Sequence, residues 1–178
     1  MKLAIYIALL AVVMMGCGTT SRPRTTPSKV AEAQATHEYP SPAPQAETVT
    51  AGSASATAAV DSFASAYINW TAQTVSGDMQ ALAASSVGQA RSAMQLAAAQ
   101  TAGDYELQQG GIANAGQVEA ITPLLGQRDR YVVVTRELTT ATATTAYQGL
   151  QPAWHVTVAT VARLSSGAWA VSGWQPKN

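Results

Sequence analysis

The sequence predicts an α+β domain in its carboxyl-terminal two thirds. Between residues 54 and 102, apolar residues recur at spacings of three and four, which is typical of amphipathic helices. From residue 105 onward, segments rich in β-branched residues alternate with turn signals, which is typical of strands. Helices first and then consecutive strands favour an antiparallel sheet with the helices packed against one face.

The helical half is predicted to contain two or three helices. The first covers residues 55–75, with a stripe formed by Val60, Phe63, Tyr67, Trp70 and Thr74. The sequence at 76–79 is expected to interrupt the chain and restart it, with Asp78 capping the next helix. That helical pattern continues to about Ala102, and residues 85–88 are a second expected interruption.

The second half is predicted to form an antiparallel meander. Residues 105–125 indicate two strands joined at 114–116, and residues 130–147 indicate one long or bent strand. Gly149 and Pro152 then mark a turn. A last hairpin leads into a strand that ends near Pro176.

Residues 154–164 are predicted to present two different strand faces. One face carries Trp154, Val156, Val158, Ala162 and Leu164, and the other carries His155, Thr157 and Arg163. Because its face is the less apolar one, His155 is expected to be solvated or at a sheet edge.

The order of these elements resembles the nuclear transport factor 2-like family, whose curved sheet wraps around amino-terminal helices as a cone. The segments that carry the resemblance are "FASAYINW" at 63–70, "GDMQAL" at 77–82 and "GAWAVSGWQP" at 167–176. The resemblance implies this fold for residues 54–178, and another small α+β sandwich is the alternative. Cone domains of this type occur in enzymes and in subunits of secretion, conjugation and envelope-transport machines.

The amino-terminal end reads as a secretory signal. Lys2 precedes an apolar run at 3–15, and a helix from Leu3 to Cys17 would span about 22 Å, short of the roughly 30 Å hydrocarbon core. The run ends in Met-Met-Gly-Cys, which resembles the bacterial lipobox. The resemblance implies a signal peptide at 1–16 and lipidation of Cys17; an uncleaved signal anchor is the alternative.

Residues 17–53 are predicted to be a disordered tether. Five prolines lie among Thr, Ser, Ala, Gln and Glu, with almost no large apolar side chains. Such a segment cannot bury enough surface to offset the entropy of ordering it. The protein is therefore expected on the extracytoplasmic face of a cell membrane, held by Cys17 through its lipid.

Composition argues against several functions. Ten Lys and Arg balance ten Asp and Glu without a basic stripe, which argues against nucleic-acid binding. The single cysteine has no partner for a disulfide or a thiolate metal cluster, and no cofactor is expected.

Candidate site residues are few. Asp61 lies off the aromatic stripe, Asp78 is interpreted as a cap, and Asp104 as a boundary residue, so no acid-base constellation is identified. A lone His155 does not make a metal site. Aromatic residues of this kind are more often core filler, and the candidates for lining a cavity are Tyr67, Trp70, Tyr105 and Trp154.

Three functions remain open from the sequence. The favoured one is a non-catalytic accessory or scaffold subunit of a bacterial envelope assembly, with envelope proteins or a second copy as partners. The second is a lipoprotein that holds a small apolar ligand in the cone. The third, a cyclase- or isomerase-like enzyme, would need an acid and a base in one cavity.

Overall fold

The computed structural model describes residues 48–49 and 51–177. The expected signal peptide, Cys17 and most of the expected tether lie outside the described residues. The chain divides into two units, residues 1–44 and 45–178, and the described residues belong to the second. Contacts with the domain begin before residue 54: Arg91 Nη2 donates to the Thr48 carbonyl at 2.7 Å, and Ser53 forms a bridge with Trp169.

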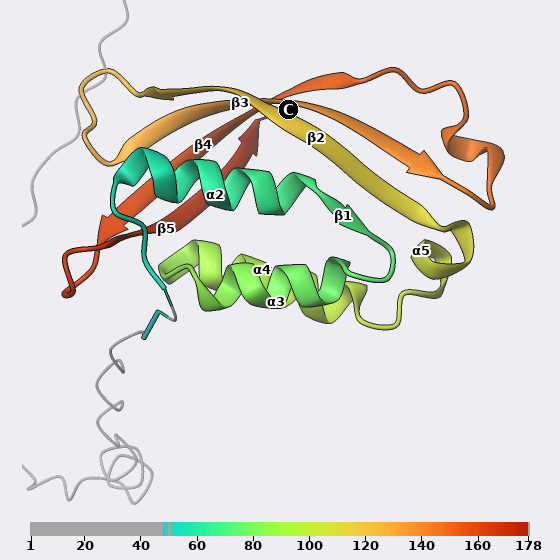
Figure 1. The fold of residues 1–178 in the computed structure, drawn as a ribbon, viewed down its shortest axis with the longest axis horizontal. Helices are drawn as coiled ribbons and strands as arrows, with labels where there is room; N and C mark the ends of the chain where they lie inside the picture. The colour runs from blue at the N-terminus through green and yellow to red at the C-terminus, as the bar shows by residue number, and fades with distance from the viewer. Residues whose placement is uncertain (1–47, 50, 178) are drawn as a thin grey trace, which may run out of the picture. The chain divides into compact units, whose positions relative to one another are not determined.

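The domain consists of helices packed against one face of a curved five-stranded sheet (Figure 1). The helices are α2 (Ala56–Ile68), α3 (Val75–Ala84), α4 (Gly88–Thr101) and α5 (Tyr105–Gly110), with a short 3₁₀ turn η1 at Thr145–Tyr147. The strands are β1 (Trp70–Thr71), β2 (Ile112–Pro123), β3 (Arg130–Ala141), β4 (Ala153–Arg163) and β5 (Trp169–Lys177). All neighbours are antiparallel, in the order β1-β2-β3-β4-β5. The predicted fold class is confirmed.

Helix α2 is shorter than the sequence predicts because Asn69 ends it. The Asn69 side chain donates to the Ser65 carbonyl at 2.8 Å and accepts from the Gly116 N–H at 3.0 Å. These bonds tie the helix end to β2, and the next two residues form β1 instead of a further helical turn. Trp70 is therefore on a strand, and its place in a helical stripe is a wrong prediction.

The restart after α2 also differs from the prediction. Helix α3 begins at Val75, so Asp78 lies in its first turn instead of capping it. Thr74 occupies the cap position, and its hydroxyl accepts from the Thr71 N–H at 3.0 Å in a tight turn. The predicted interruption at 85–88 is confirmed, because α3 ends at Ala84 and α4 begins at Gly88.

The segment 105–125 contains one helix and one strand, so the two predicted strands are wrong. Asp104 caps α5 by accepting from the Leu107 N–H at 3.0 Å, and Gly111 ends it in the left-handed region at φ 57°. The expected turn at 114–116 is instead paired in register with residues 137–139 of β3. A bulge between Val118 and Ala120 bends this single strand, so sequence alternation weakens there.

We call the sheet face toward the helices the inner face, and the opposite one the outer face. On β3, Tyr131, Val133 and Thr135 are buried while the intervening residues are only half-buried. On β4 the buried residues are Thr157, Ala159 and Val161. The core lies between the inner face and the helices, where the larger buried side chains are Phe63, Met79, Leu82, Met94 and Trp174.

The alternation of β4 therefore corrects the prediction for residues 154–164. The more apolar set, with Trp154, Val156 and Val158, lies on the outer face, and the set with His155 and Thr157 lies on the inner face. The inner positions of β4 are small because the Trp174 ring, which pairs in register with Ala159, takes up the space.

Candidate functional site

A hollow of about 480 Å³, open on one side, lies between the inner face and the helices. Its walls come from the end of α2, from β1, α3 and α4, from the inner faces of β2, β3 and β4, and from the loop before β4. The residues that line it are Tyr67, Trp70, Val75, Met79, Ala97, Thr101, Asn114, Glu137, Thr139, Leu150, Gln151, Ala153 and His155. We refer to this site as the hollow.

A half-buried carboxylate, Glu137, is the centre of the polar groups in the hollow. Thr135 Oγ1 donates to its Oε1 at 2.5 Å, and Asn114 Nδ2 donates to its Oε2 at 2.9 Å. Asn114 Nδ2 also donates to the Ile68 carbonyl at 2.7 Å, and its Oδ1 accepts from the Thr139 hydroxyl at 2.9 Å. The network fixes the position of the carboxylate and joins β2, β3 and the end of α2.

The chain makes room for Glu137 at Gly116, which pairs with it across the two strands. A Cβ atom at residue 116 would lie 2.9 Å from Glu137 Cγ and 2.7 Å from the carbonyl oxygen of Arg136. Both distances are shorter than real Cβ contacts, so only glycine fits without displacement.

The field of Glu137 extends across the hollow to Tyr67. Burial and then the negative charge of Glu137 raise the pKa of the Tyr67 phenol above its ordinary value of 10.0. The indole N–H of Trp174 is close enough to oppose this shift of the Tyr67 pKa, although it makes no hydrogen bond of normal geometry within the described residues. The Tyr67 and Trp174 rings lie 5.4 Å apart between centroids.

The candidate cavity residues have separate locations. Tyr67 and Trp70 line the hollow. Tyr105 is 70% exposed on α5, and Trp154 is 62% exposed on the outer face of β4, where Arg136 lies over its ring at 5.9 Å. The first pair was selected as part of a helical stripe, although a turn and a strand, not one helix, bring Trp70 to this place.

Of Asp61, Asp78, Asp104 and His155, which were considered from the sequence as acid, base or metal-binding groups, His155 alone lines the hollow. Asp61 lies on exposed helix surface, Asp78 is half-buried in the first turn of α3, and Asp104 caps α5. The predicted solvent exposure of His155 is confirmed, although its face of β4 is the inner one.

Sequence reasoning missed Glu137 and Asn114. Glu137 is separated by an even number of positions from Tyr131, Val133 and Thr135, so strict alternation along β3 would have placed it on the inner face. Asn114 was interpreted as a turn residue. With a carboxylate, an imidazole and a phenol, the hollow can bind and orient a polar ligand.

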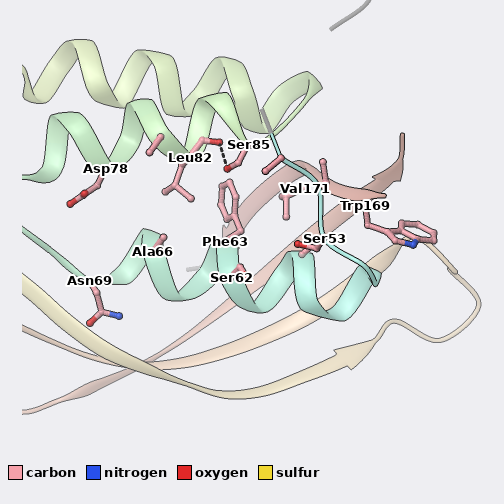
Figure 2. Close-up of a pocket in the computed structure, with 14 residues that line it drawn as sticks. Ser53, Ser62, Phe63, Ala66, Asn69, Asp78, Leu82, Ser85, Trp169 and Val171 are labelled. Atoms are coloured by element: carbon pink, nitrogen blue, oxygen red, sulfur yellow. Dashed lines mark hydrogen bonds between the residues drawn. The ribbon is translucent and has the colours of Figure 1, made fainter. Parts of the chain in front are cut away.

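A second concavity, of about 390 Å³, is a groove between α2 and α3 with β5 beneath it (Figure 2). Phe63, Leu82 and Val171 form its apolar centre, and Asp78 and Asn69 lie at one end. The polar side chains Ser85 and Asn69 are bonded within the fold, to the Leu82 carbonyl and to β2 respectively. This groove therefore offers mainly apolar contact.

The outer face carries a third surface, which we call the outer patch. Val132 pairs with Val158 and Val134 with Val156 across β3 and β4, and Trp154 follows next to Arg136. Val156 is 41% exposed. The helices α2, α3 and α4 lie on the other side of the sheet, so they do not cover this patch (Figure 1).

Two further properties concern the described residues alone. No helix within residues 48–49 and 51–177 is long and apolar enough to cross a bilayer. In the same part of the chain, no three His, Cys, Asp or Glu side chains gather as metal ligands.

Comparison with known proteins supports the fold. The structure of Agrobacterium tumefaciens VirB8 protein is similar, with a TM-score of 0.50 and 10% sequence identity, over 68% of this chain and 88% of that chain. At this identity the likeness concerns the fold alone, and it agrees with the nuclear transport factor 2-like arrangement. No family model and no curated protein sequence matches the chain.

Proposed function

We propose that this chain is an extracytoplasmic lipoprotein, anchored through Cys17, that acts as a non-catalytic accessory or scaffold subunit of a bacterial envelope assembly. The assembly is of the secretion, conjugation or transport type. The cone domain is the part that docks, and residues 17–53 give it reach from the membrane.

The observation that carries this proposal is the fold that the domain shares with VirB8, a secretion-system protein. The shared fold supports the class of assembly and leaves its identity open. The lipobox-like sequence before Cys17 supports the anchor, because several acyl chains at one cysteine hold a protein stably at a bilayer.

The outer patch supports a docking role. Val156 and Trp154 are exposed there, and Val132, Val134 and Val158 beside them are half-buried. Covering these apolar side chains with a partner removes them from water, which is favourable. The hydrogen bonds of Glu137 support the non-catalytic part, because both carboxylate oxygens already accept from side chains of the fold.

The anchor is tested by replacing Cys17 with Ala in the producing cell. We expect the variant to leave the membrane fraction or to accumulate with its leader attached, as judged by fractionation and by the intact mass of the protein. Ser21→Ala, a change in the same segment that keeps the thiol, is the control. A Cys17→Ala protein processed and bound to the membrane like the natural chain would contradict the anchor.

The docking role is tested by mild crosslinking in intact cells. We expect the natural chain to form defined higher-mass species, and Trp154→Lys to lose most of them because a charge interrupts the outer patch. Tyr105→Lys is the matched control, since Tyr105 is also an exposed aromatic residue but lies on α5. Equal loss in the two variants, or crosslinked species unchanged by Trp154→Lys, would count against docking through this face.

A further inference from the structure

The charge in the hollow is not balanced by the fold. Both oxygens of Glu137 accept hydrogen bonds from neutral side chains, Thr135 and Asn114. Within the described residues no Lys or Arg lines the hollow, and Glu137 makes no ion pair. Arg136, its neighbour in sequence, points to the opposite face, where it lies over the Trp154 ring. A half-buried carboxylate of this kind favours a cation beside it.

The walls of the hollow suit a cation that has an apolar body. Trp70 and Tyr67 are aromatic rings, whose faces attract cations. Val75, Met79 and Leu150 provide apolar contact on the other sides. The position of Glu137 is fixed in advance by its two bonds and by the space at Gly116, so a ligand would not have to order it.

We propose that the hollow is a binding site for an organic cation, an alkylammonium group held by Glu137 between Tyr67 and Trp70. Tyr67 lines the same hollow as Glu137, and burial first and then the negative charge of Glu137 raise the pKa of its phenol. The inference differs from the second function considered from the sequence, in which the cone holds a small apolar ligand, because the ligand proposed here is charged. It rests on the hollow alone and stands whether or not the chain serves an envelope assembly.

The same ammonium chemistry can come from a small amine or from the lysine side chain of a partner. The hollow is open at its rim, where His155 and Gln151 are exposed, so either source can enter. An anion is disfavoured by Glu137, and a neutral apolar molecule would leave that charge without a partner in a partly desolvated site.

The test is calorimetric titration of the full-length protein with n-hexylammonium, with hexan-1-ol as the neutral probe of equal chain length. Titrations are made at about pH 8, where n-hexylammonium carries its positive charge. We expect the ammonium to bind at least about tenfold more tightly than the alcohol, a difference of about 1.4 kcal/mol.

Two variants locate the site. Glu137→Gln is expected to weaken hexylammonium binding at least about tenfold, whereas Asp61→Asn, which removes an equal charge from exposed surface, is expected to leave it unchanged. Glu137→Gln places a second amide donor next to Asn114 and can disturb folding. Gln151→Lys avoids this difficulty, because it adds a tethered ammonium from an exposed loop and should block hexylammonium. Gln151→Met is its neutral control.

The outcomes separate clearly. Equal binding of ammonium and alcohol, no binding of the ammonium, or equal weakening by Asp61→Asn would each overturn the proposal. Hexylammonium binding that is unchanged both in Gln151→Lys and in a folded Glu137→Gln protein would also overturn it. A blocked-termini Gly-Lys-Gly peptide, compared with Gly-Gln-Gly, distinguishes the sources: tighter binding than hexylammonium supports a partner lysine, and weaker binding supports a small amine.

Discussion

The two faces of β3 and β4 differ far more in surroundings than in composition. Val133 is completely buried on the inner face, and its neighbour Val134 is half-buried on the outer face. On β4 the contrast runs against simple hydrophobicity, because Thr157 is buried while Val156 is 41% exposed. The residue type therefore does not show which face of the strand is buried; the position of the helices determines it.

The inner face combines small side chains with large rings from elsewhere. Phe63 and Tyr67 of α2 contact the Trp174 ring at centroid distances of 5.0 and 5.4 Å. Ala159 pairs with Trp174 in register, and a larger side chain there would compete with the ring. The outer face lacks such a partner in the described structure of α2–α4, so it keeps its own Val and Trp side chains in contact with water.

The difference between the two faces is tested most directly by placing a charge at two adjacent positions of β3, one on each face. We expect Val133→Asp to lower the free energy of unfolding by more than about 4 kcal/mol, because it buries an unpaired carboxylate. Val134→Asp should cost less than about 1 kcal/mol, because its side chain reaches water. Urea unfolding of both variants, followed by circular dichroism, measures the difference; similar losses would mean that the assigned faces are wrong.

Replacing two glycines with alanine tests the packing on the inner face, with a smaller expected change in the free energy of unfolding. Gly116→Ala should cost about 1–3 kcal/mol, because the new methyl group meets Glu137 Cγ and the Arg136 carbonyl. Gly77→Ala on α3 meets nothing within 4 Å and should stabilise the domain by about 0.5–1 kcal/mol through helix propensity. Equilibrium unfolding compares them, and a neutral Gly116→Ala would show that Glu137 is not held against β2.

The smallest expected effect is confined to alkaline pH. Because the pKa of Tyr67 is raised in the folded state, the unfolded chain loses this proton first, and the folded state loses stability as pH rises above about 10. Tyr67→Phe should reduce that decline and change little below it. Thermal melts between neutral pH and pH 11 measure the slope, with Tyr105→Phe as the exposed control; an unaltered slope in Tyr67→Phe would contradict the raised pKa of Tyr67.

Much of the site escaped the sequence for identifiable reasons. The helical spacing selected Tyr67, yet its neighbour Trp70 reaches the hollow only because Asn69 ends α2 and bonds to β2. Asn114 resembles a turn residue by propensity, but pairing with β3 places it in a strand. Glu137 looked like one charge among many, since no local pattern shows that Thr135 and Asn114 will bond it.

The sequence by itself determined the α+β order, the break between α3 and α4, the start of β3 and the positions of β4 and β5. The predicted strand at 130–147 is too long, because β3 ends at Ala141 and residues 145–147 form η1. The leader and the lipidation of Cys17 lie outside the described residues and stay predictions. The elements that the sequence determined follow from local periodicity, which records the backbone conformation of neighbouring residues. The tertiary structure decided the face of each strand, the length of α2, the single strand at 112–123 and the hollow around Glu137. These depend on which distant segments pair and pack, and a side chain carries no local mark of the partner it will meet across the sheet.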